Sequence, residues 1–403
     1  MRFLRITDSY PAYMEQFYQC RPQLAGKSFA EQRHAFYFDH FTWGDSLAEP
    51  LAKHGYEVLD IESGALPLLA AWAKENLQLP ENQTAEEIVV EQAVRFRPDV
   101  LMFDSPNRQL LARLKAAIPS IRLVIGWTGS ALGLVEIWQD MNIVLSCAPE
   151  SVGALRQRGY RAELVSHAFD ARVLQRLKPK QREISVSFIG SIIRRSAFHF
   201  QREKILLELA AHCPLTIFTP STKAGPRDYF KAVAVAGLYG ISSVLEAVAL
   251  REVVARRSRA CANLLRLASP PRLPVNRRLA RIAKPAVYGL DYYQVMRESD
   301  VSLNIHADSS VEYASNIRLF EATGVGSCLL TDWRSNLHKF FEIDREVVAY
   351  RSSEECLEKA RWLLNYPLKA QEIARRGQER TLATHTFQQR ATEVDAIIRS
   401  HLL

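Results

Sequence analysis

The feature of this sequence that most constrains its fold is a repeated alternation of short apolar strands with amphipathic helices. In the first half we expect strands near residues 34–38, 56–60, 97–104, 122–127 and 143–147, and helices near 46–54, 84–96 and 110–118. Thr84 and Glu87 have the spacing of a capping box at the start of the second helix. Strands that alternate with helices form parallel sheets covered by helices on both faces. The first half therefore predicts a parallel α/β domain.

The same alternation returns after a polar stretch that we interpret as a linker. A strand at 184–190 begins the second series, and the rhythm breaks between residues 221 and 285 before it resumes. A chain of 403 residues is also too long for one ordinary core. We therefore predict the following division: an N-terminal Rossmann-like domain at 1–170, a linker at 171–183, and a C-terminal Rossmann-like domain at 184–386 with a helical, basic insertion at 221–285.

Positive charge is concentrated in part of this insertion. The whole chain carries a formal charge of +8, whereas residues 251–284 alone hold ten Lys or Arg and one acid. Three interpretations stay open for this segment: contact with an anionic membrane, where each basic residue contributes about 1 kcal/mol, binding of a phosphate-bearing acceptor, or a solvated helix face. No aromatic residues are interleaved with the arginines, so we expect no nucleic-acid partner.

Cysteine spacing and hydropathy indicate the cellular compartment. The six cysteines are scattered and none has C-x-x-C spacing, which argues against a zinc site or a disulfide framework and favours a reducing compartment. No unbroken run of 18 apolar residues is present, so we expect no transmembrane helix. The N-terminus lacks the apolar core of a signal peptide. We expect a cytoplasmic protein that residues 251–284 attach to the inner face of the plasma membrane if the membrane interpretation holds.

The most informative motif lies between residues 303 and 332. It contains Leu-Asn-Ile-His, then Glu-Tyr-Ala-Ser-Asn-Ile-Arg-Leu-Phe-Glu-Ala-Thr-Gly-Val-Gly, then Cys-Leu-Leu-Thr-Asp. This order resembles the donor site of GT-B glycosyltransferases in the CgeB-like (spore-maturation-protein-B-like) group 1 branch. In that branch an N-x-R-x-F-E-A helix ends in a glycine turn and a short strand. The resemblance covers roughly residues 184–220 and 285–400.

The resemblance implies a fold and an activity. The fold would be GT-B, with two Rossmann-like domains facing a central cleft and a last helix, 387–403, that packs back on the N-terminal domain. The activity would be that of a metal-independent, hexosyltransferase-like glycosyltransferase without a cofactor. It would move a sugar from a nucleotide-sugar donor to a glycan or lipid-linked glycan, in cell-surface polysaccharide or O-antigen biosynthesis.

The predicted donor site combines one carboxylate with several cations. Glu321 matches the family's carboxylate for the two ribose hydroxyls, which would make charge-assisted hydrogen bonds to it. Arg318 lies on the same helical face, where its guanidinium suits the diphosphate. At the end of the strand 184–190, a glycine allows the backbone to approach phosphate closely. The remaining predicted donor residues are Asn316, Gly190, Ser191, Arg194 and Arg195, with Arg202 also at the entry of the helix expected at about 201–212.

The acceptor side of the sequence is less informative. The commoner retaining pattern has two glutamates with seven residues between them, but the position before Glu321 that would complete it is Tyr313, and Glu312 is one place off. An inverting enzyme needs a general base, and the candidates are Asp39, His40, Asp45, Asp104 and His167. Among these we select Asp45 and His167 as catalytic, although Asp45 also suits a helix cap and His167 a packing role. We expect Trp43 and Trp127 to bind the acceptor.

Two rival functions remain open on the same fold. A nucleotide-sugar 2-epimerase would need several acid and base groups around the sugar, and the sequence does not identify them. A non-catalytic sugar- or lipid-binding protein is the second rival, and the presence of both Glu321 and Arg318 argues against it. A Rossmann oxidoreductase is disfavoured because no G-x-G-x-x-G follows the first strand.

Overall fold

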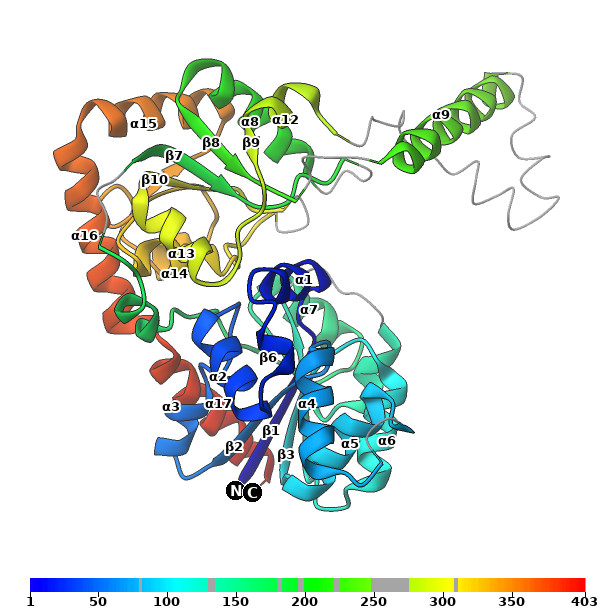
Figure 1. Ribbon diagram of the computed structural model, residues 1–403. Helices are drawn as coiled ribbons and strands as arrows, with labels where there is room; N and C mark the ends of the chain where they lie inside the picture. Colours follow the sequence, from blue (N-terminus) through cyan, green and yellow to red (C-terminus); the bar gives the residue numbers. More distant parts are fainter. Residues whose placement is uncertain are drawn as a thin grey trace.

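The part of the chain that the structure describes forms two six-stranded parallel sheets, each covered by helices (Figure 1). The computed structural model describes residues 1–79, 82–129, 135–179, 183–194, 199–220, 225–247, 275–307 and 311–402. All registered pairs between neighbouring strands are parallel in both sheets. This architecture confirms the predicted α/β class with two Rossmann-like domains.

The N-terminal sheet has the strand order β2-β1-β3-β4-β5-β6. Its strands are β1 Arg2–Thr7, β2 Glu57–Glu62, β3 Val100–Asp104, β4 Leu123–Thr128, β5 Ile143–Ser146 and β6 Ala162–Leu164. Our sequence reading missed β1, although it lies inside the sheet between β2 and β3. Two arginines interrupt its apolar pattern, and one of them, Arg5, is buried and paired with Asp60 at 3.6 Å. The strand was missed because Arg5, a charged residue, occupies a buried position that an apolar pattern would fill with a hydrophobic side chain.

Helices cover both faces of this sheet (Figure 1). They are α1 Pro11–Gln19, α2 Phe29–Asp39, α3 Ala48–Lys53, α4 Leu66–Asn76, α5 Ala85–Phe96, α6 Arg108–Ala117 and α7 Pro149–Gln157. The predicted capping box of Thr84 and Glu87 is present at α5. The predicted strand at 34–38 is wrong, because these residues belong to α2. A second capping box, formed by Ser28 and Glu31, starts that helix.

The C-terminal sheet has the strand order β12-β11-β10-β7-β8-β9. Its strands are β7 Ile184–Ile189, β8 Leu215–Phe218, β9 Ala283–Lys284, β10 Ser299–Asn304, β11 Cys328–Asp332 and β12 Val348–Tyr350. Its helices are α8 Phe200–His212, α12 Arg277–Ile282, α13 Gly289–Glu298, α14 Arg318–Gly324, α15 Ser353–Asn365 and α16 Pro367–Thr384. The motif that carries the resemblance thus forms β10, α14 and β11 of one sheet domain.

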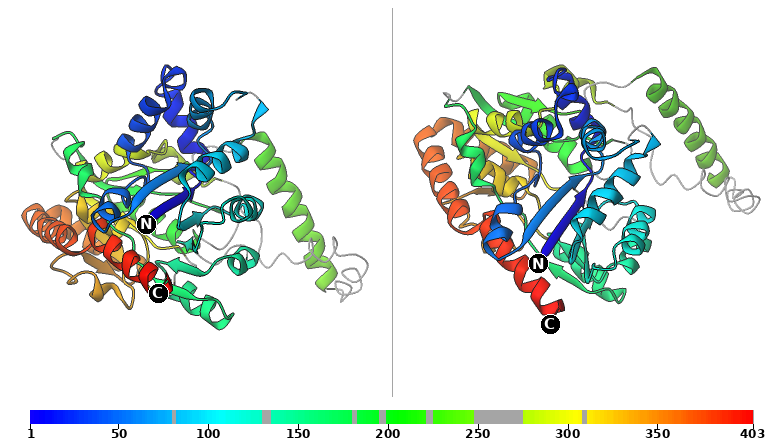
Figure 2. Two further views of the ribbon diagram at one scale, coloured as in Figure 1. Left: turned by 90° about the horizontal axis from the view of Figure 1, so that it is seen from below. Right: turned by 60° about the horizontal axis from the view of Figure 1, so that its bottom comes forward.

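Two chain segments connect the sheets. Between β6 and β7, a 3₁₀ helix, Ala171–Gln175, buries Val173 completely, so the expected linker is partly packed. At the other end, α16 leads into α17, Phe387–Leu402, which packs against α3 and β4 of the N-terminal half (Figure 2). The Tyr56 hydroxyl donates to Asp395 of α17 at 2.8 Å.

Helix α9, Pro226–Ala247, extends away from the body of the molecule (Figure 1). By length and composition alone, it is the one described helix that could cross a membrane: Tyr229–Ala247 has a mean hydropathy of 1.3, and no part of the apolar window is buried. Our prediction of no such helix relied on unbroken apolar runs. In Tyr229–Ala247, Lys231 and several Gly and Ser residues interrupt the apolar run, but the mean hydropathy of the segment stays high enough for a membrane-spanning helix.

Candidate functional site

Two adjoining cavities lie where the carboxyl ends of both sheets meet. The first, which we call the Glu321 cavity, has a volume of about 600 Å³ and includes Gly190, Ser191, Arg318 and Glu321 in its wall. The second, the Trp43 cavity, measures about 490 Å³. The two share a boundary formed by Tyr10, Phe41, Thr42, His199, Arg202, Asn316 and Ile317. Ligands of parallel sheets bind outside the carboxyl ends of the strands, so both cavities are in the expected place.

Glu321 lies in the wall of its cavity with only 4% of its surface exposed. The hydroxyl of Tyr292 donates to its Oε2 at 2.6 Å, and the hydroxyl of Tyr293 donates to its Oε1 at 3.1 Å. Burial raises the pKa of Glu321, and the two tyrosines and Arg318 oppose this effect. Each carboxylate oxygen retains an unused lone pair after these bonds. The side chain is therefore oriented by protein and still able to accept from a ligand.

Arg318 lies beside this carboxylate at the start of α14. Its Nε donates to the Tyr292 hydroxyl at 3.3 Å, and its backbone N–H donates to Asn316 Oδ1 at 3.0 Å. Asn316 in turn donates from Nδ2 to Asn304 Oδ1 at 2.8 Å, so it positions the loop before the helix. A Cβ on Gly190 would lie 3.8 Å from Arg318 Nη2. The guanidinium and the Gly190 backbone thus face the same space.

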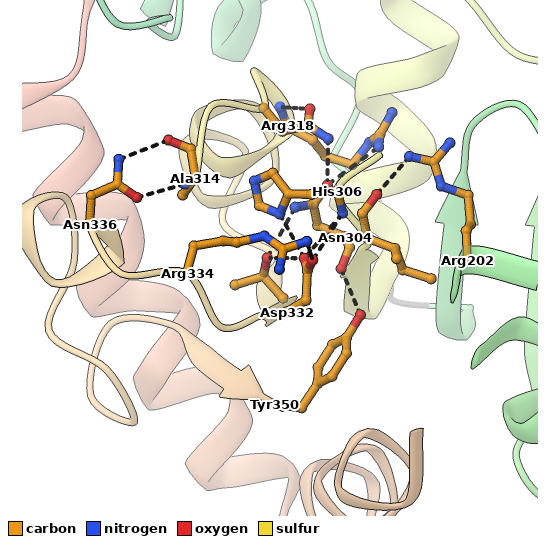
Figure 3. Close-up of polar contacts among 12 residues, drawn as sticks. Arg202, Asn304, His306, Ala314, Arg318, Asp332, Arg334, Asn336 and Tyr350 are labelled. Carbon is orange, nitrogen blue, oxygen red and sulfur yellow. Dashed lines mark hydrogen bonds and ion pairs between the residues drawn. The ribbon is translucent and has the colours of Figure 1, made fainter. Parts of the chain in front are cut away.

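The loop between β10 and α14 is held by bonds to neighbouring elements (Figure 3). The Asn336 amide accepts from the Ala314 backbone N–H at 2.6 Å and donates to its carbonyl at 3.1 Å. The Tyr350 hydroxyl donates to the carbonyl of Asn304 at 3.1 Å. These contacts hold the backbone that precedes Asn316 and Arg318.

Arg202 of α8 lies at the boundary of the two cavities and lines both. Its guanidinium donates to the carbonyl of Ile305 at 2.7 Å (Figure 3). It also donates to the carbonyl of Ser191 at 2.9 Å, so Arg202 joins the ends of β7 and β10. Sequence reading placed Arg202 near the helix start but preferred the two preceding arginines. Its buried position, with 6% exposed, came from tertiary packing that the sequence does not reveal.

Of those two arginines, the structure describes only Arg194. Arg194 is paired with Glu203, with its Nε 3.0 Å from both carboxylate oxygens, and it lines neither the Glu321 cavity nor the Trp43 cavity. Glu203 also accepts from Asn276. The prediction that Arg194 binds phosphate is therefore corrected, because a buried carboxylate has taken its guanidinium. Arg195 lies outside the described residues.

Trp43, Trp127 and His167 all line the Trp43 cavity. The two indole rings lie 4.5 Å apart between centroids, and Trp43 Nε1 donates to His167 Nδ1 at 3.1 Å. An indole N–H can only donate, so Nδ1 of His167 has no proton and Nε2 carries it. Burial lowers the pKa of His167 to about 3, which keeps the ring neutral. His167 can therefore donate a hydrogen bond, but it is not a base at its Nε2, contrary to our prediction.

Asp45 lines neither cavity. Its carboxylate accepts from Arg172 at 2.8 Å, and the same guanidinium contacts Asp170 at 2.6 Å. These bonds tie the loop before α3 to the segment between the sheets. The contacts give Asp45 a structural role in place of the predicted catalytic one, since its carboxylate is paired with Arg172 and lines neither cavity.

Two other carboxylates form part of the N-terminal wall of the Trp43 cavity, Asp8 and Asp104. Asp104 accepts from the Thr7 hydroxyl at 3.3 Å, and Asp8 accepts from Ser105 at 2.6 Å. Burial is the main reason that the pKa of Asp104 is raised, and Asp8 adds to the effect. Asp8 was missed because it follows β1, the strand that the sequence reading did not identify. Glu312, the displaced glutamate of the retaining pattern, is exposed and lines neither cavity.

Comparisons with known proteins place the fold. A family model described as glycosyl transferase-like matches residues 253–396, about a third of the chain. HepE of Anabaena, solved with UDP and glucose, is 14% identical, with a TM-score of 0.53 and coverage of 99% of this chain and 100% of its own. Sucrose-phosphate synthase from Thermosynechococcus elongatus is 10% identical, with a TM-score of 0.53 and coverages of 99% and 98%. Comparison with curated proteins gives no match.

A further solved structure, AviGT4, a glycosyltransferase involved in avilamycin A biosynthesis, is 11% identical, with a TM-score of 0.52 and coverages of 100% and 98%. At such identities the likeness defines the fold. The chain has the GT-B fold, two Rossmann-like domains of six parallel strands each, as the sequence predicted. Membership of the CgeB-like branch stays a prediction.

Proposed function

We propose that this protein is a GT-B glycosyltransferase that transfers a sugar from a nucleotide-sugar donor to a glycan or lipid-linked glycan. The observation that carries the proposal is Glu321, a buried carboxylate that faces an interdomain cavity and retains free lone pairs. A buried charge is costly unless it has partners. The hydroxyl pair of a ribose would supply two more hydrogen bonds to a group that the tyrosines already orient.

The donor would extend from one cavity to the other. With its ribose on Glu321, its diphosphate would lie between Arg318 and the Gly190 backbone, and the Arg202 guanidinium is next in line at the cavity boundary. These cations would stabilise the negative charge that develops on the departing diphosphate, which is the need a metal ion meets in other enzymes. Since HepE was solved with UDP, UDP is the first nucleotide to test.

The acceptor would bind in the Trp43 cavity against the two tryptophans. In the reaction, the acceptor oxygen forms a bond to C1 of the sugar, the bond from C1 to the phosphate oxygen breaks, and its electron pair leaves with the diphosphate. We assign the acceptor proton to Asp104, because burial raises its pKa toward the range useful for a general base. His167 would donate a hydrogen bond to the bound acceptor. This scheme inverts the configuration at C1.

The test is an incubation with a panel of UDP-sugars, with and without glycan acceptors, followed by mass spectrometry and NMR of the sugar. Transfer predicts a product heavier than the acceptor by one sugar residue, and Glu321→Gln should abolish it. Glu312→Gln is the matched control, because Glu312 is exposed on the same motif and should not matter.

The two rivals give different results in the same assay. Conversion of the donor sugar without acceptor, and without transfer when acceptor is added, would support an epimerase. Tight nucleotide binding without any turnover across the panel would support a binding protein. Either result would replace the proposed function.

We also propose that the protein acts in the cytoplasm at the inner face of the membrane, in cell-surface polysaccharide or O-antigen biosynthesis. Helix α9 supports attachment, because Phe230, Val233, Ile241 and Val244 are exposed and their spacing places them on one stripe. The sequence after α9 adds the basic segment 251–284, of which only residues from 275 onward are described. An apolar stripe next to basic residues is typical of binding to anionic lipid.

Vesicle flotation tests this attachment. The protein should float with vesicles that contain anionic lipid, and the double variant Phe230→Glu, Ile241→Glu should remain in solution. Ala236→Glu, on another face of the same helix, is the control for charge alone. Equal flotation of all three proteins would contradict the assignment to this stripe.

A further inference from the structure

His306 is a buried side chain that our proposed mechanism does not yet use. It follows β10, is only 2% exposed, and lines the Trp43 cavity together with Ala307 and Ser315. Its backbone N–H donates to Asp332 at 3.1 Å, and its Nδ1 lies 2.7 Å from Oδ1 of the same carboxylate (Figure 3). The main chain and the ring of His306 are thus fixed by one residue at the end of β11.

Asp332 determines which ring nitrogen of His306 carries the proton. Arg334 lies 2.7 Å from the second oxygen of Asp332. Burial would raise the pKa of Asp332, but His306 and Arg334 outweigh it and hold this pKa below its usual value. An ionised carboxylate only accepts hydrogen bonds, so Nδ1 must be the donor. In the neutral ring, Nε2 then has a lone pair and can only accept.

Nε2 of His306 has no hydrogen-bond partner in the part of the chain that the structure describes. Leaving a buried polar atom unpaired is unfavourable. Such an atom in the side chain of a cavity-lining residue is the arrangement expected where a ligand supplies the missing bond. The ligand group must be a donor, which a sugar hydroxyl is and a phosphate oxygen is not.

The position of His306 in the cavity indicates whether it would contact the donor sugar or the acceptor. In the proposed function the donor would extend from the Glu321 cavity across the boundary at Arg202 and Asn316, which line both cavities, so its sugar would enter the Trp43 cavity beside residues of the C-terminal sheet. His306 is on that side, whereas Asp104 and the tryptophans come from the N-terminal half. We propose that Nε2 of His306 accepts a hydrogen bond from a hydroxyl of the donor sugar and selects donors that carry this hydroxyl. This inference rests on the proposed function.

Calorimetry with UDP, UDP-glucose, UDP-galactose and UDP-N-acetylglucosamine separates the two claims. For the sugar that gains most affinity over UDP, His306→Ala should reduce that gain by about three- to tenfold, the range for one hydrogen bond, and leave UDP binding unchanged. His306→Gln, whose amide oxygen can accept in place of Nε2, should recover part of the gain. One monodeoxy analogue of the sugar should bind the wild type and His306→Ala equally.

The contrary results are also distinct. Equal losses for UDP and UDP-sugar would mean that His306 only supports the fold, and unchanged affinity for both would mean that it meets no sugar. Both outcomes overturn the inference and leave the proposed function standing. Failure of the wild type to bind UDP or any of the three UDP-sugars would overturn the proposed function, and this inference with it.

Discussion

Replacement of Tyr292 by Phe removes one hydroxyl between the two residues on which the donor site depends. That hydroxyl donates to Glu321 at 2.6 Å and accepts from Arg318 Nε at 3.3 Å. Tyr293→Phe is the matched control, because its bond to Glu321 is longer, at 3.1 Å, and it has no recorded bond to Arg318. Both changes keep the ring and therefore the packing.

The expected magnitude follows from the charge on Glu321. A hydrogen bond to a charged group contributes about 1.5–3 kcal/mol. Because every 1.4 kcal/mol is a factor of about ten, its loss should shift the ionisation equilibrium of Glu321 by roughly ten- to a hundredfold toward the protonated form. Burial already raises the pKa of Glu321, so the variant should carry a neutral carboxyl over a wider range of pH.

Calorimetric affinity for UDP as a function of pH measures this shift. The ionised carboxylate is the form that binds ribose best, so affinity should be highest at neutral pH and fall as pH falls through the pKa of Glu321. In Tyr292→Phe this fall should begin at a higher pH than in the wild type, and Tyr293→Phe should lie between them. A fall at the same or lower pH, or a larger shift for Tyr293→Phe, would refute the reasoning.

Two further predictions concern stability. Gly324→Ala should lower the free energy of unfolding by about 1–3 kcal/mol, because the new Cβ would lie 2.4 Å from Phe169. Gly237→Ala on α9 is the control, because the new Cβ has open space there and should cost nothing. Urea unfolding of both variants checks this, and equal stabilities would contradict it. Arg5→Met should cost about 3–5 kcal/mol at neutral pH, because it leaves Asp60 buried without its cation. In the wild type the pKa of Asp60 is raised to about 6, mainly by burial, and Arg5 opposes this effect, so in the variant the pKa should be higher. The cost should therefore shrink in urea unfolding as pH falls toward 6 and Asp60 becomes neutral in the variant; a cost independent of pH would show that Asp60 is not the reason.

The sequence predicted those features that follow from local pattern. The alternation of strands and helices gave the class, and the motif around Asn316, Arg318 and Glu321 gave three residues that the structure places at one end of the Glu321 cavity. Trp43 and Trp127 likewise lie together. The three motif residues are neighbours because a short sequence spacing places them in α14 or just before it, whereas the two tryptophans are distant in the sequence and only the tertiary structure brings them together.

The errors arose where distant partners decide the role of a side chain. Asp45 and Arg194 have suitable side chains and lie near the carboxyl edge of a sheet. However, Asp45 is ion-paired with Arg172, and Arg194 is ion-paired with Glu203. Arg202 was passed over for its neighbours, since only packing shows which arginine of a run turns inward. No local spacing connects these partners, so a single sequence could not assign them.

His306 and Asp332 are a second case in which tertiary structure, and not local sequence, determines the role of a residue. Both were within the motif that carried the resemblance, but 26 positions separate them, and only the parallel pairing of β10 with β11 brings them together. The role of each residue is set by that register and by the neighbouring Arg334.

A crystal structure of the protein with UDP would test the central claim most directly. The account predicts that both ribose hydroxyls lie within about 3 Å of the Glu321 carboxylate oxygens, with the diphosphate between Arg318 and Gly190. Density for the nucleotide elsewhere, or in this cavity with its ribose turned away from Glu321, would contradict it.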